Sequence, residues 1–108
     1  MRLALLVVAL SSGLAFAQPA VHRCAAAAVE QAGKLLTFHF GPDARIDLDK
    51  TVRVLAPLKN PANPKQVFEV LEIGGSIYKG RYRMRLIYAQ LPGDCVLMGQ
   101  EILELATL

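Results

Sequence analysis

The chain has 108 residues, which is enough for one domain with a single hydrophobic core and too few for two. Hydrophobic residues make up 54% of it, a content that excludes a disordered or collagen-like chain. The net charge is only +3, from 12 Lys and Arg against 9 Asp and Glu. A charge this small gives no reason to expect nucleic acid as a partner.

The first stretch of the chain has the pattern of an export signal. Met1 and Arg2 form a short positive start, residues 3–10 are an unbroken apolar run, and Ala15 and Ala17 are the small residues that a signal peptidase reads. We therefore predict a signal peptide over 1–17 and a single small domain over 18–108. A membrane anchor is the alternative, but the apolar run is much shorter than the roughly 20 residues that cross a bilayer.

This leader also predicts where the mature protein resides. A short signal with a single Arg suits bacterial export, so we expect a periplasmic protein, with full secretion as the alternative. The sequence after the leader contains no apolar stretch long enough to span a membrane, and we expect no membrane span in the mature chain.

Two cysteines, Cys24 and Cys95, are the only ones in the chain. In an exported protein of this size they are expected to form a disulfide. The bond would close a loop of about 71 residues, which stabilises a fold by about 4 kcal/mol in the chain-entropy model. A redox or nucleophilic thiol is the alternative, but the sequence has no Cys-x-x-Cys.

A helix is predicted from Val21 to the residues before Gly41. Apolar residues recur there at three- and four-residue steps, among them Ala28, Ala32 and Leu35. Gly accepts the left-handed conformation that ends a helix, and the Pro that follows Gly41 cannot continue one. The result is one helix of about 18 residues.

After this helix the apolar period falls to two, which predicts strands over 45–56, 66–73, 76–90 and 95–105. The Pro-rich stretch 57–64 is expected to be a loop, and Gly74-Gly75 and Pro92-Gly93 to be hairpin turns. The expected fold is therefore α+β, an N-terminal helix packed on a four-stranded antiparallel meander sheet with one disulfide. In outline it resembles cystatin-like folds, a likeness of architecture that carries no function.

The register of the last hairpin follows from its turn. If Pro92 and Gly93 are the central turn residues, Gln90 faces Cys95 and Arg81 faces Glu104. Alternation then places an apolar set on the face that holds the cysteine, and the disulfide docks the helix there. The expected members of this face are Tyr78, Tyr82, Met84, Leu86, Tyr88, Cys95, Leu97, Leu103 and Leu105.

The opposite face is expected to carry a basic ladder, defined as Lys79, Arg81, Arg83 and Arg85. Alternate residues of a strand project on one side about 6.7 Å apart, a spacing that suits a row of carboxylates or phosphates. The alternative is a solvated outer face, partly neutralised by Glu72 and Glu104.

Apolar residues are expected beside this ladder, at Ile87, Ala89, Val96, Met98 and Ile102. A single sheet with one helix has nothing to cover them, and a mixed apolar and basic patch is typical of a protein interface. A curled sheet, or the 57–64 loop folded back, is the alternative.

These patterns lead to a hypothesis about function. We expect a small exported, non-enzymatic binding module that contacts an envelope protein or an anionic envelope component, or that forms a homodimer. The residues expected to make this contact are Lys79, Arg81, Arg83, Arg85 and Met98. A structural subunit of an envelope complex is a related alternative. We expect no cofactor.

A small hydrolase or metal-dependent enzyme that uses His39 with Asp43 or Asp47 is the enzymatic alternative. The acidic residues near Asp43 do not have EF-hand spacing, and His22 and His39 lie at opposite ends of the predicted helix. The chain also lacks Gly-x-Ser-x-Gly and a phosphate-binding glycine loop. We therefore expect no catalytic and no metal-binding residues.

Overall fold

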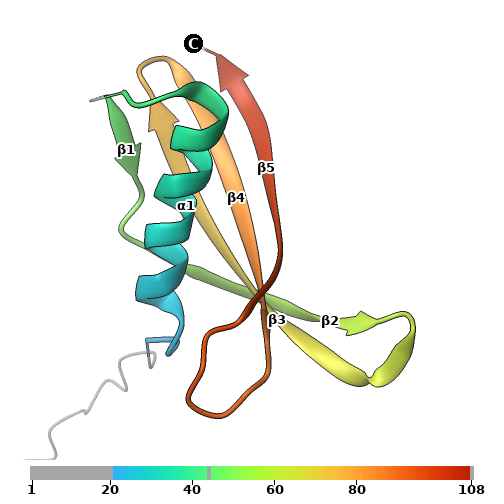
Figure 1. The fold of residues 1–108 in the computed structure, drawn as a ribbon. Helices are drawn as coiled ribbons and strands as arrows, with labels where there is room; N and C mark the ends of the chain where they lie inside the picture. The colour runs from blue at the N-terminus through green and yellow to red at the C-terminus, as the bar shows by residue number, and fades with distance from the viewer. Residues whose placement is uncertain (1–20, 44, 108) are drawn as a thin grey trace, which may run out of the picture.

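The computed structural model of the protein describes residues 21–43 and 45–107. The predicted signal peptide over 1–17 lies outside these residues, as does the start of the predicted domain at residue 18. Figure 1 shows one helix packed on a five-stranded, mostly antiparallel sheet, which confirms the α+β class. The elements are α1 (Ala25–Phe40), β1 (Ile46–Leu48), β2 (Arg53–Asn60), β3 (Asn63–Ile77), β4 (Gly80–Ala89) and β5 (Leu97–Thr107).

Helix α1 follows the apolar period of its sequence. Its buried side is small at the start, where it consists of alanines, and larger at the end, where it consists of leucines. The helix ends at Gly41, which has a φ of 77° and donates its backbone N–H to the carbonyl oxygen of Thr37. This confirms the predicted stop. The buried residues are Ala25, Ala28, Ala32, Leu35 and Leu36.

The sheet contains one strand more than predicted. Strands β2, β3, β4 and β5 form the expected antiparallel meander, but the extended stretch 45–56 is divided into β1 and β2. Both pair with the same edge of β3, β1 with residues 75–77 and β2 with residues 63–72. The stretch breaks where the side chain of Asp49 lies over Gly74 and binds Arg81.

The Gly74-Gly75 pair is not a turn, which corrects the prediction. Strand β3 continues through it to Ile77, and the turn lies at Tyr78 and Lys79. A Cβ atom on Gly75 would lie 3.3 Å from side-chain carbons of Leu36 and Met84. Glycine therefore allows the helix to pack closely on the sheet at this position. Tyr78, expected on the apolar face, lies in the turn with a φ of 55° and is exposed.

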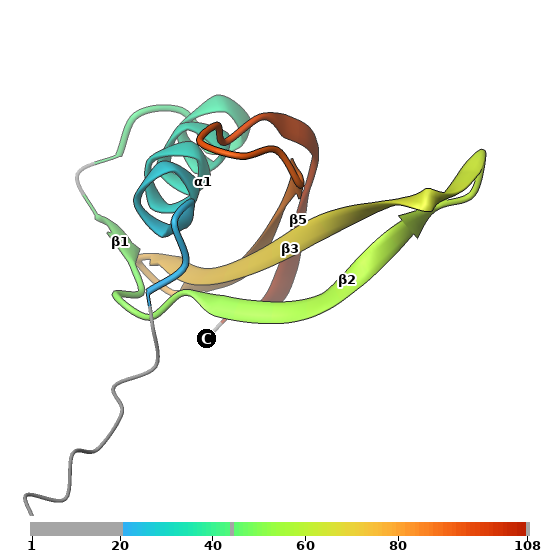
Figure 2. The same cartoon turned by 90° about the horizontal axis from the view of Figure 1, so that it is seen from below.

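The Pro-rich stretch 57–64 was also predicted wrongly as a loop. Strand β2 runs to Asn60 and β3 begins at Asn63, with Pro61 and Ala62 between them. Strand β4 pairs with β3 only as far as Phe68, so residues 63–67 pair with β2 alone. The two strands form a ribbon that projects beyond the rest of the sheet (Figure 2). Proline is tolerated in β2 because that strand pairs on one side only.

The β4–β5 register agrees with the prediction only near the turn. Tyr88 faces Leu97 as expected, but the pairing then shifts by one residue and Ile87 faces Gly99. This β-bulge moves the residues from Gly99 to Glu104 to the face opposite to the predicted one, and a second register shift follows at Leu105. Ile102 packs against the core, whereas Leu103 and Leu105, expected in the core, lie on the opposite face.

The core lies between α1 and the sheet. The disulfide between Cys24 and Cys95 is present, with 5.7 Å between the two Cα atoms, which confirms the pairing. It joins the start of α1 to the loop before β5 and so fixes which face of the sheet the helix covers. The largest fully buried side chains are Leu36, Leu71, Ile73, Met84, Leu86 and Cys24.

Candidate functional site

The candidate site is the face of the sheet opposite α1, called here the outer face. Arg81, Arg83 and Arg85 alternate on β4 with the buried residues Tyr82, Met84 and Leu86 and therefore project from it. Lys79, the fourth member of the predicted basic ladder, lies in the turn before β4, and its ammonium nitrogen is 5.4 Å from the centre of the Tyr78 ring. The ladder on the strand thus has three cations.

Glu72 of β3 lies at the centre of the outer face and is only 7% exposed. Its carboxylate accepts a hydrogen bond from Nε of Arg85 at 2.9 Å, and a nitrogen of Arg53 on β2 lies 3.4 Å away. Nε of Arg83 is 3.6 Å from the same carboxylate. The carboxylate raises the pKa of Arg85 above its usual value. One buried carboxylate therefore accepts hydrogen bonds from Arg85 and Arg53 and lies near a third guanidinium group, that of Arg83.

Two further carboxylates meet the arginines of the outer face. Arg81 donates two hydrogen bonds to Asp49, at 2.7 and 3.2 Å, and Arg85 lies 3.4 Å from Glu101. Glu104 is not opposite Arg81 as predicted, because the register places it opposite Tyr82 and places Ala106 opposite Arg81. An anionic polymer on this face would have to compete with these ion pairs for the guanidinium groups.

Two apolar residues of β5 lie beside the arginines, since Leu103 pairs with Arg83 and Leu105 lines a cavity with Arg81 and Arg83. Met98 lies further along β5, at the register shift beyond Glu101. Met98, Leu103 and Leu105 together are called here the β5 stripe. These side chains are 52%, 49% and 51% exposed. Two of the predicted apolar members of the patch do not belong to it, because Ala89 is buried and Ile102 packs against the core. Since the β5 stripe is half exposed, the 57–64 segment does not cover it. Exposed apolar side chains that adjoin fixed charges are typical of an interface.

The residues of the enzymatic alternative do not come together. The rings of Phe38 and Phe40 lie beside His39, with centroid distances of 5.4 and 6.2 Å. Asp43 binds Arg45 at 2.8 Å, and this hydrogen bond lowers the pKa of Asp43 to about 2. Over the residues that the structure describes, no hydrogen bond or ion pair joins His39 to an aspartate. The geometry provides no acid–base pair there.

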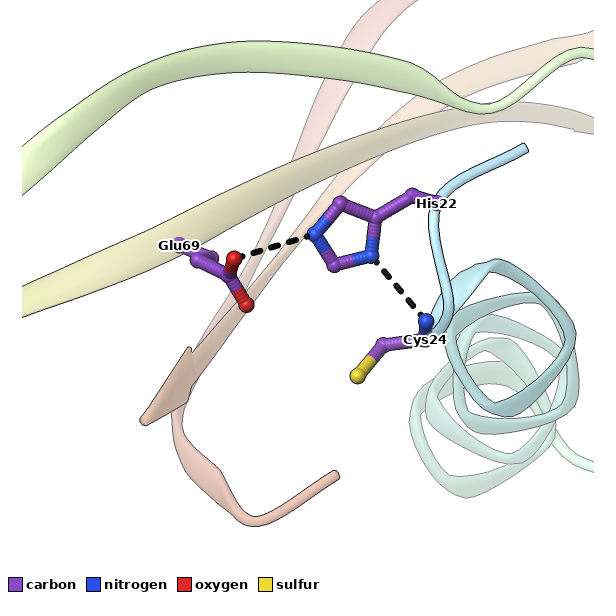
Figure 3. A group of neighbouring side chains, drawn as sticks. All are labelled: His22, Cys24 and Glu69. Atoms are coloured by element: carbon purple, nitrogen blue, oxygen red, sulfur yellow. Dashed lines mark hydrogen bonds and ion pairs between the residues drawn. The ribbon is translucent and has the colours of Figure 1, made fainter. Parts of the chain in front are cut away.

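Sequence reasoning missed one cluster, which Figure 3 shows at the start of α1. Nδ1 of His22 accepts the backbone N–H of Cys24 at 3.0 Å, and Nε2 lies 3.4 Å from Glu69. Ligand atoms of these three residues lie within 4.8 Å of one another, a spacing that a metal ion can bridge. The sulfur of Cys24 is bonded to Cys95, however, and Nδ1 is occupied, so this donor set offers no thiolate and no free Nδ1.

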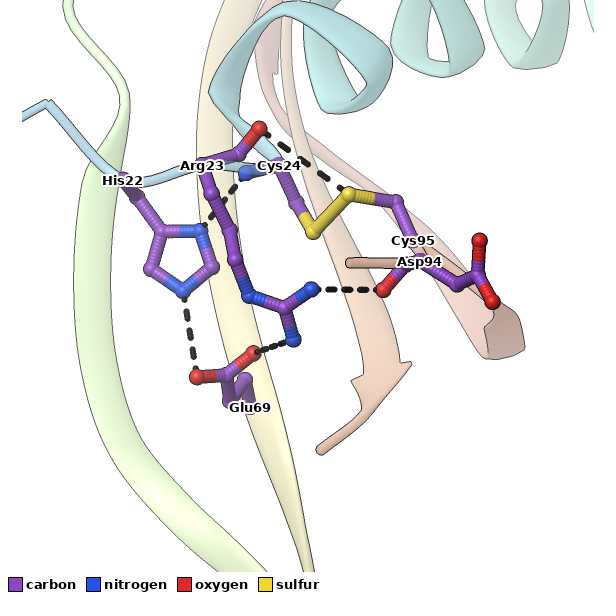
Figure 4. The surroundings of a disulfide bond; sticks show 6 residues. All are labelled: His22, Arg23, Cys24, Glu69, Asp94 and Cys95. Carbon is purple, nitrogen blue, oxygen red and sulfur yellow. Dashed lines mark hydrogen bonds and ion pairs between the residues drawn. A yellow bond between two sulfur atoms is a disulfide. The ribbon is translucent and has the colours of Figure 1, made fainter. Parts of the chain in front are cut away.

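The same cluster has a structural role around the disulfide. Arg23 donates a hydrogen bond to the carbonyl oxygen of Asp94 at 2.6 Å and a second to Glu69 at 3.4 Å (Figure 4). Three segments, the start of α1, β3 and the loop before β5, are thus joined by polar contacts next to the covalent bond. Only the register of β3 places Glu69 there, and no local sequence pattern indicates it.

An apolar groove of about 580 Å³ lies between the first turns of α1 and the start of β2. Val21, Val29 and Val54 are among the residues that line it, with Lys50 at its margin. Ligand sites combine an apolar lining with polar groups that converge on the ligand. The polar residues of its described lining are His22, Lys50 and Thr51, and His22 is already engaged by Cys24 and Glu69. The outer face, where several charged groups converge, is therefore the better candidate.

Comparison of the chain with family models, with curated proteins and with solved structures finds no match. Residues 21–43 and 45–107 contain no helix with the length and apolar character needed to cross a membrane. The function must therefore be inferred from the geometry of the outer face.

Proposed function

We propose that the protein is a small exported, non-enzymatic binding module whose outer face contacts a protein. The observation that carries this proposal is the β5 stripe, whose three apolar side chains remain half exposed, two of them next to arginines that are already held by carboxylates. Fixed charges beside exposed apolar surface give both specificity and hydrophobic driving force.

A protein suits this face better than an anionic polymer does. Arg81 and Arg85 are each engaged by carboxylates at 2.7 and 2.9 Å, so they present little free positive charge to a chain of phosphates or carboxylates. Such a polymer would also leave Met98, Leu103 and Leu105 uncovered. A folded protein can cover both parts of the face at once.

An envelope location belongs to the same proposal. The export pattern over 1–17 supports it, as does the disulfide, which persists in oxidising compartments. The partner is accordingly an envelope protein, and the same surface on a second copy is the homodimer alternative.

The test is capture of a partner from an envelope extract by three forms of the mature protein. These are the unmodified chain, the double variant Leu103→Ser/Leu105→Ser, and the control Phe38→Ser. Phe38 is 84% exposed on α1, so its replacement removes an equally large apolar side chain from outside the outer face. Captured proteins are identified by mass spectrometry and their bound fractions compared.

We expect a protein that the unmodified chain and Phe38→Ser retain and that the double variant loses. Equal capture by all three forms contradicts the proposal, since the β5 stripe would then make no contribution. Light scattering over a dilution series tests the homodimer separately. If the mass of the unmodified chain falls by half on dilution, and the double variant has the lower, monomer mass at every concentration, the partner of the stripe is a second copy of the chain.

A further inference from the structure

A small cavity of about 190 Å³ lies on the outer face above Gly74. Gly74 of β3 pairs with Arg83 of β4, which in turn pairs with Leu103 of β5. A Cβ atom on Gly74 would overlap the carboxylate of Asp49 and lie 3.1 Å from a guanidinium nitrogen of Arg81. Glycine at this position therefore leaves room for charged groups to meet above the strand.

Arg83 is the least satisfied cation of this cavity. Among the described residues, its ion pair is with Glu72 at 3.6 Å, which is too long for a hydrogen bond. Its Nε is buried and has no hydrogen-bond partner. The carboxylate of Glu72 lies closer to Arg85 and Arg53, at 2.9 and 3.4 Å. The long contact with Glu72 leaves Arg83 poorly satisfied, so an additional acceptor on its terminal guanidinium nitrogens is favourable, although a group from solvent cannot reach the buried Nε.

The charged residues that line the cavity have an excess of one positive charge. Three arginines contribute to its lining, and two carboxylates, Asp49 and Glu72, face them. The side chain of Arg83 is 29% exposed, so an incoming group can reach the part of it that faces solvent, whereas Nε is buried. A guanidinium group binds a carboxylate through two parallel hydrogen bonds in one plane. One anionic group therefore balances the set.

We propose that this cavity binds one carboxylate, and that the carboxylate is an Asp or Glu side chain of the partner protein. The source of the carboxylate rests on the function proposed above. Leu105 lines the cavity and Leu103 pairs with Arg83, so an acidic residue flanked by apolar residues matches both the charge and the stripe. A free small anion would leave these leucines in water.

The experiment is a titration of the oxidised mature protein, followed through the Nε–Hε signals of arginine in ¹⁵N NMR spectra. The probes are the capped peptide Ac-Leu-Glu-Leu-NH₂, its counterpart Ac-Leu-Gln-Leu-NH₂, and sodium acetate. We expect the Glu peptide to shift the Arg83 signal in a saturable manner and to bind about tenfold more tightly than acetate. The Gln peptide should leave this signal in place.

Two variants locate the effect. Arg83→Gln, followed through the Nε–Hε signals of Arg53 and Arg81 in the same cavity, should weaken binding of the Glu peptide by roughly ten- to a hundredfold, because a charge-assisted pair of hydrogen bonds is lost. Arg45→Gln is the control, since Arg45 binds Asp43 and takes no part in the cavity, and its affinity should equal that of the unmodified chain. The dispersion of the amide spectrum verifies that each variant is folded.

Three results overturn the proposal. An Arg83 signal that does not move, or that the Gln peptide moves equally, shows that the cavity does not bind a carboxylate. Acetate that binds as tightly as the Glu peptide shows that the leucines contribute nothing and removes the protein side chain as the source. Partner capture tests the β5 stripe in a separate measurement. A saturable shift at Arg83 without stripe-dependent capture would contradict the proposed function, whereas carboxylate binding by the cavity would still stand.

Discussion

The two faces of the sheet exclude water by different means. On the face under α1, Leu71, Ile73 and Met84 are fully buried by apolar contacts, and a disulfide holds the helix in place. On the outer face, which no second layer formed by the described residues covers, Glu72 is buried beside the guanidinium groups of Arg53 and Arg85. Apolar packing is non-directional and strong, whereas ion pairs are directional and sensitive to salt. The covered face therefore supplies stability, and the outer face is suited to recognition.

Removal of the disulfide should have the largest effect on the covered face. The double variant Cys24→Ala/Cys95→Ala should lose about 4 kcal/mol of unfolding free energy, because the unfolded chain gains the freedom that the cross-link removed. The contacts of Arg23 with Asp94 and Glu69 should preserve the native arrangement. Urea unfolding of the oxidised protein and the variant measures the difference. An unchanged midpoint would contradict the stabilising role of the bond.

A matched pair of leucine replacements compares the two faces directly. Leu36→Ala should cost about 3 kcal/mol, since Leu36 is fully buried and its removal leaves a cavity. Leu103→Ala removes the same atoms from a half-exposed position and should cost less than about 1 kcal/mol. Urea unfolding at low protein concentration gives both values. Equal losses would mean that Leu103 is covered in solution.

The charged cluster of the outer face can be tested by Glu72→Gln. We expect a loss of about 1 to 2 kcal/mol, because three guanidinium groups lose their shared carboxylate but remain partly solvated. Unfolding measurements in low and high salt check this value, and the loss should shrink as salt increases. The double variant Glu72→Gln/Arg53→Gln is the control, in which part of the repulsion is relieved. A loss that is independent of salt would argue for packing rather than charge.

The smallest effect concerns Asp43, whose isolated ion pair with Arg45 serves as a reference for the Glu72 cluster. The pKa of Asp43 is lowered from 3.8 to about 2 by its hydrogen bond with Arg45. A lowered pKa in the folded state contributes stability above pH 3.8 that is lost as the pH falls toward about 2. NMR titration of the Asp43 carboxyl carbon should show a midpoint near this lower value. In Arg45→Gln the midpoint should return toward 3.8, and an unchanged midpoint would exclude Arg45 as the cause.

The helix, the disulfide and the α+β class could be predicted because each depends on local or unique signals. Gly41 ends the helix, and Cys24 has only Cys95 as a partner. Of the β5 stripe, Met98 was expected to be exposed, but Leu103 and Leu105 could not be predicted. The bulge before Gly99 changes the register of β5, and a glycine in a strand does not by itself indicate a bulge.

The glycine pair in β3 shows a second limit of the sequence. Gly74 and Gly75 have the pattern of a hairpin turn, but each lies under a side chain that leaves little room for a Cβ atom. This side chain is Asp49 on the outer face for Gly74 and Leu36 on the helix side for Gly75. Such contacts depend on the register of distant strands. For the same reason, the sequence predicted that Glu72 lies near the basic ladder, but it could not predict that Glu72 is buried among Arg53, Arg83 and Arg85.

The ribbon formed by the end of β2 and the start of β3 has a practical consequence. Pro61 and Ala62 at its tip are exposed, and residues 63–67 pair with no strand other than β2. A fluorophore or affinity tag inserted between Pro61 and Ala62 should therefore leave the disulfide, the core and the outer face undisturbed. The tip thus offers a point of attachment from which the protein can be immobilised with its outer face free.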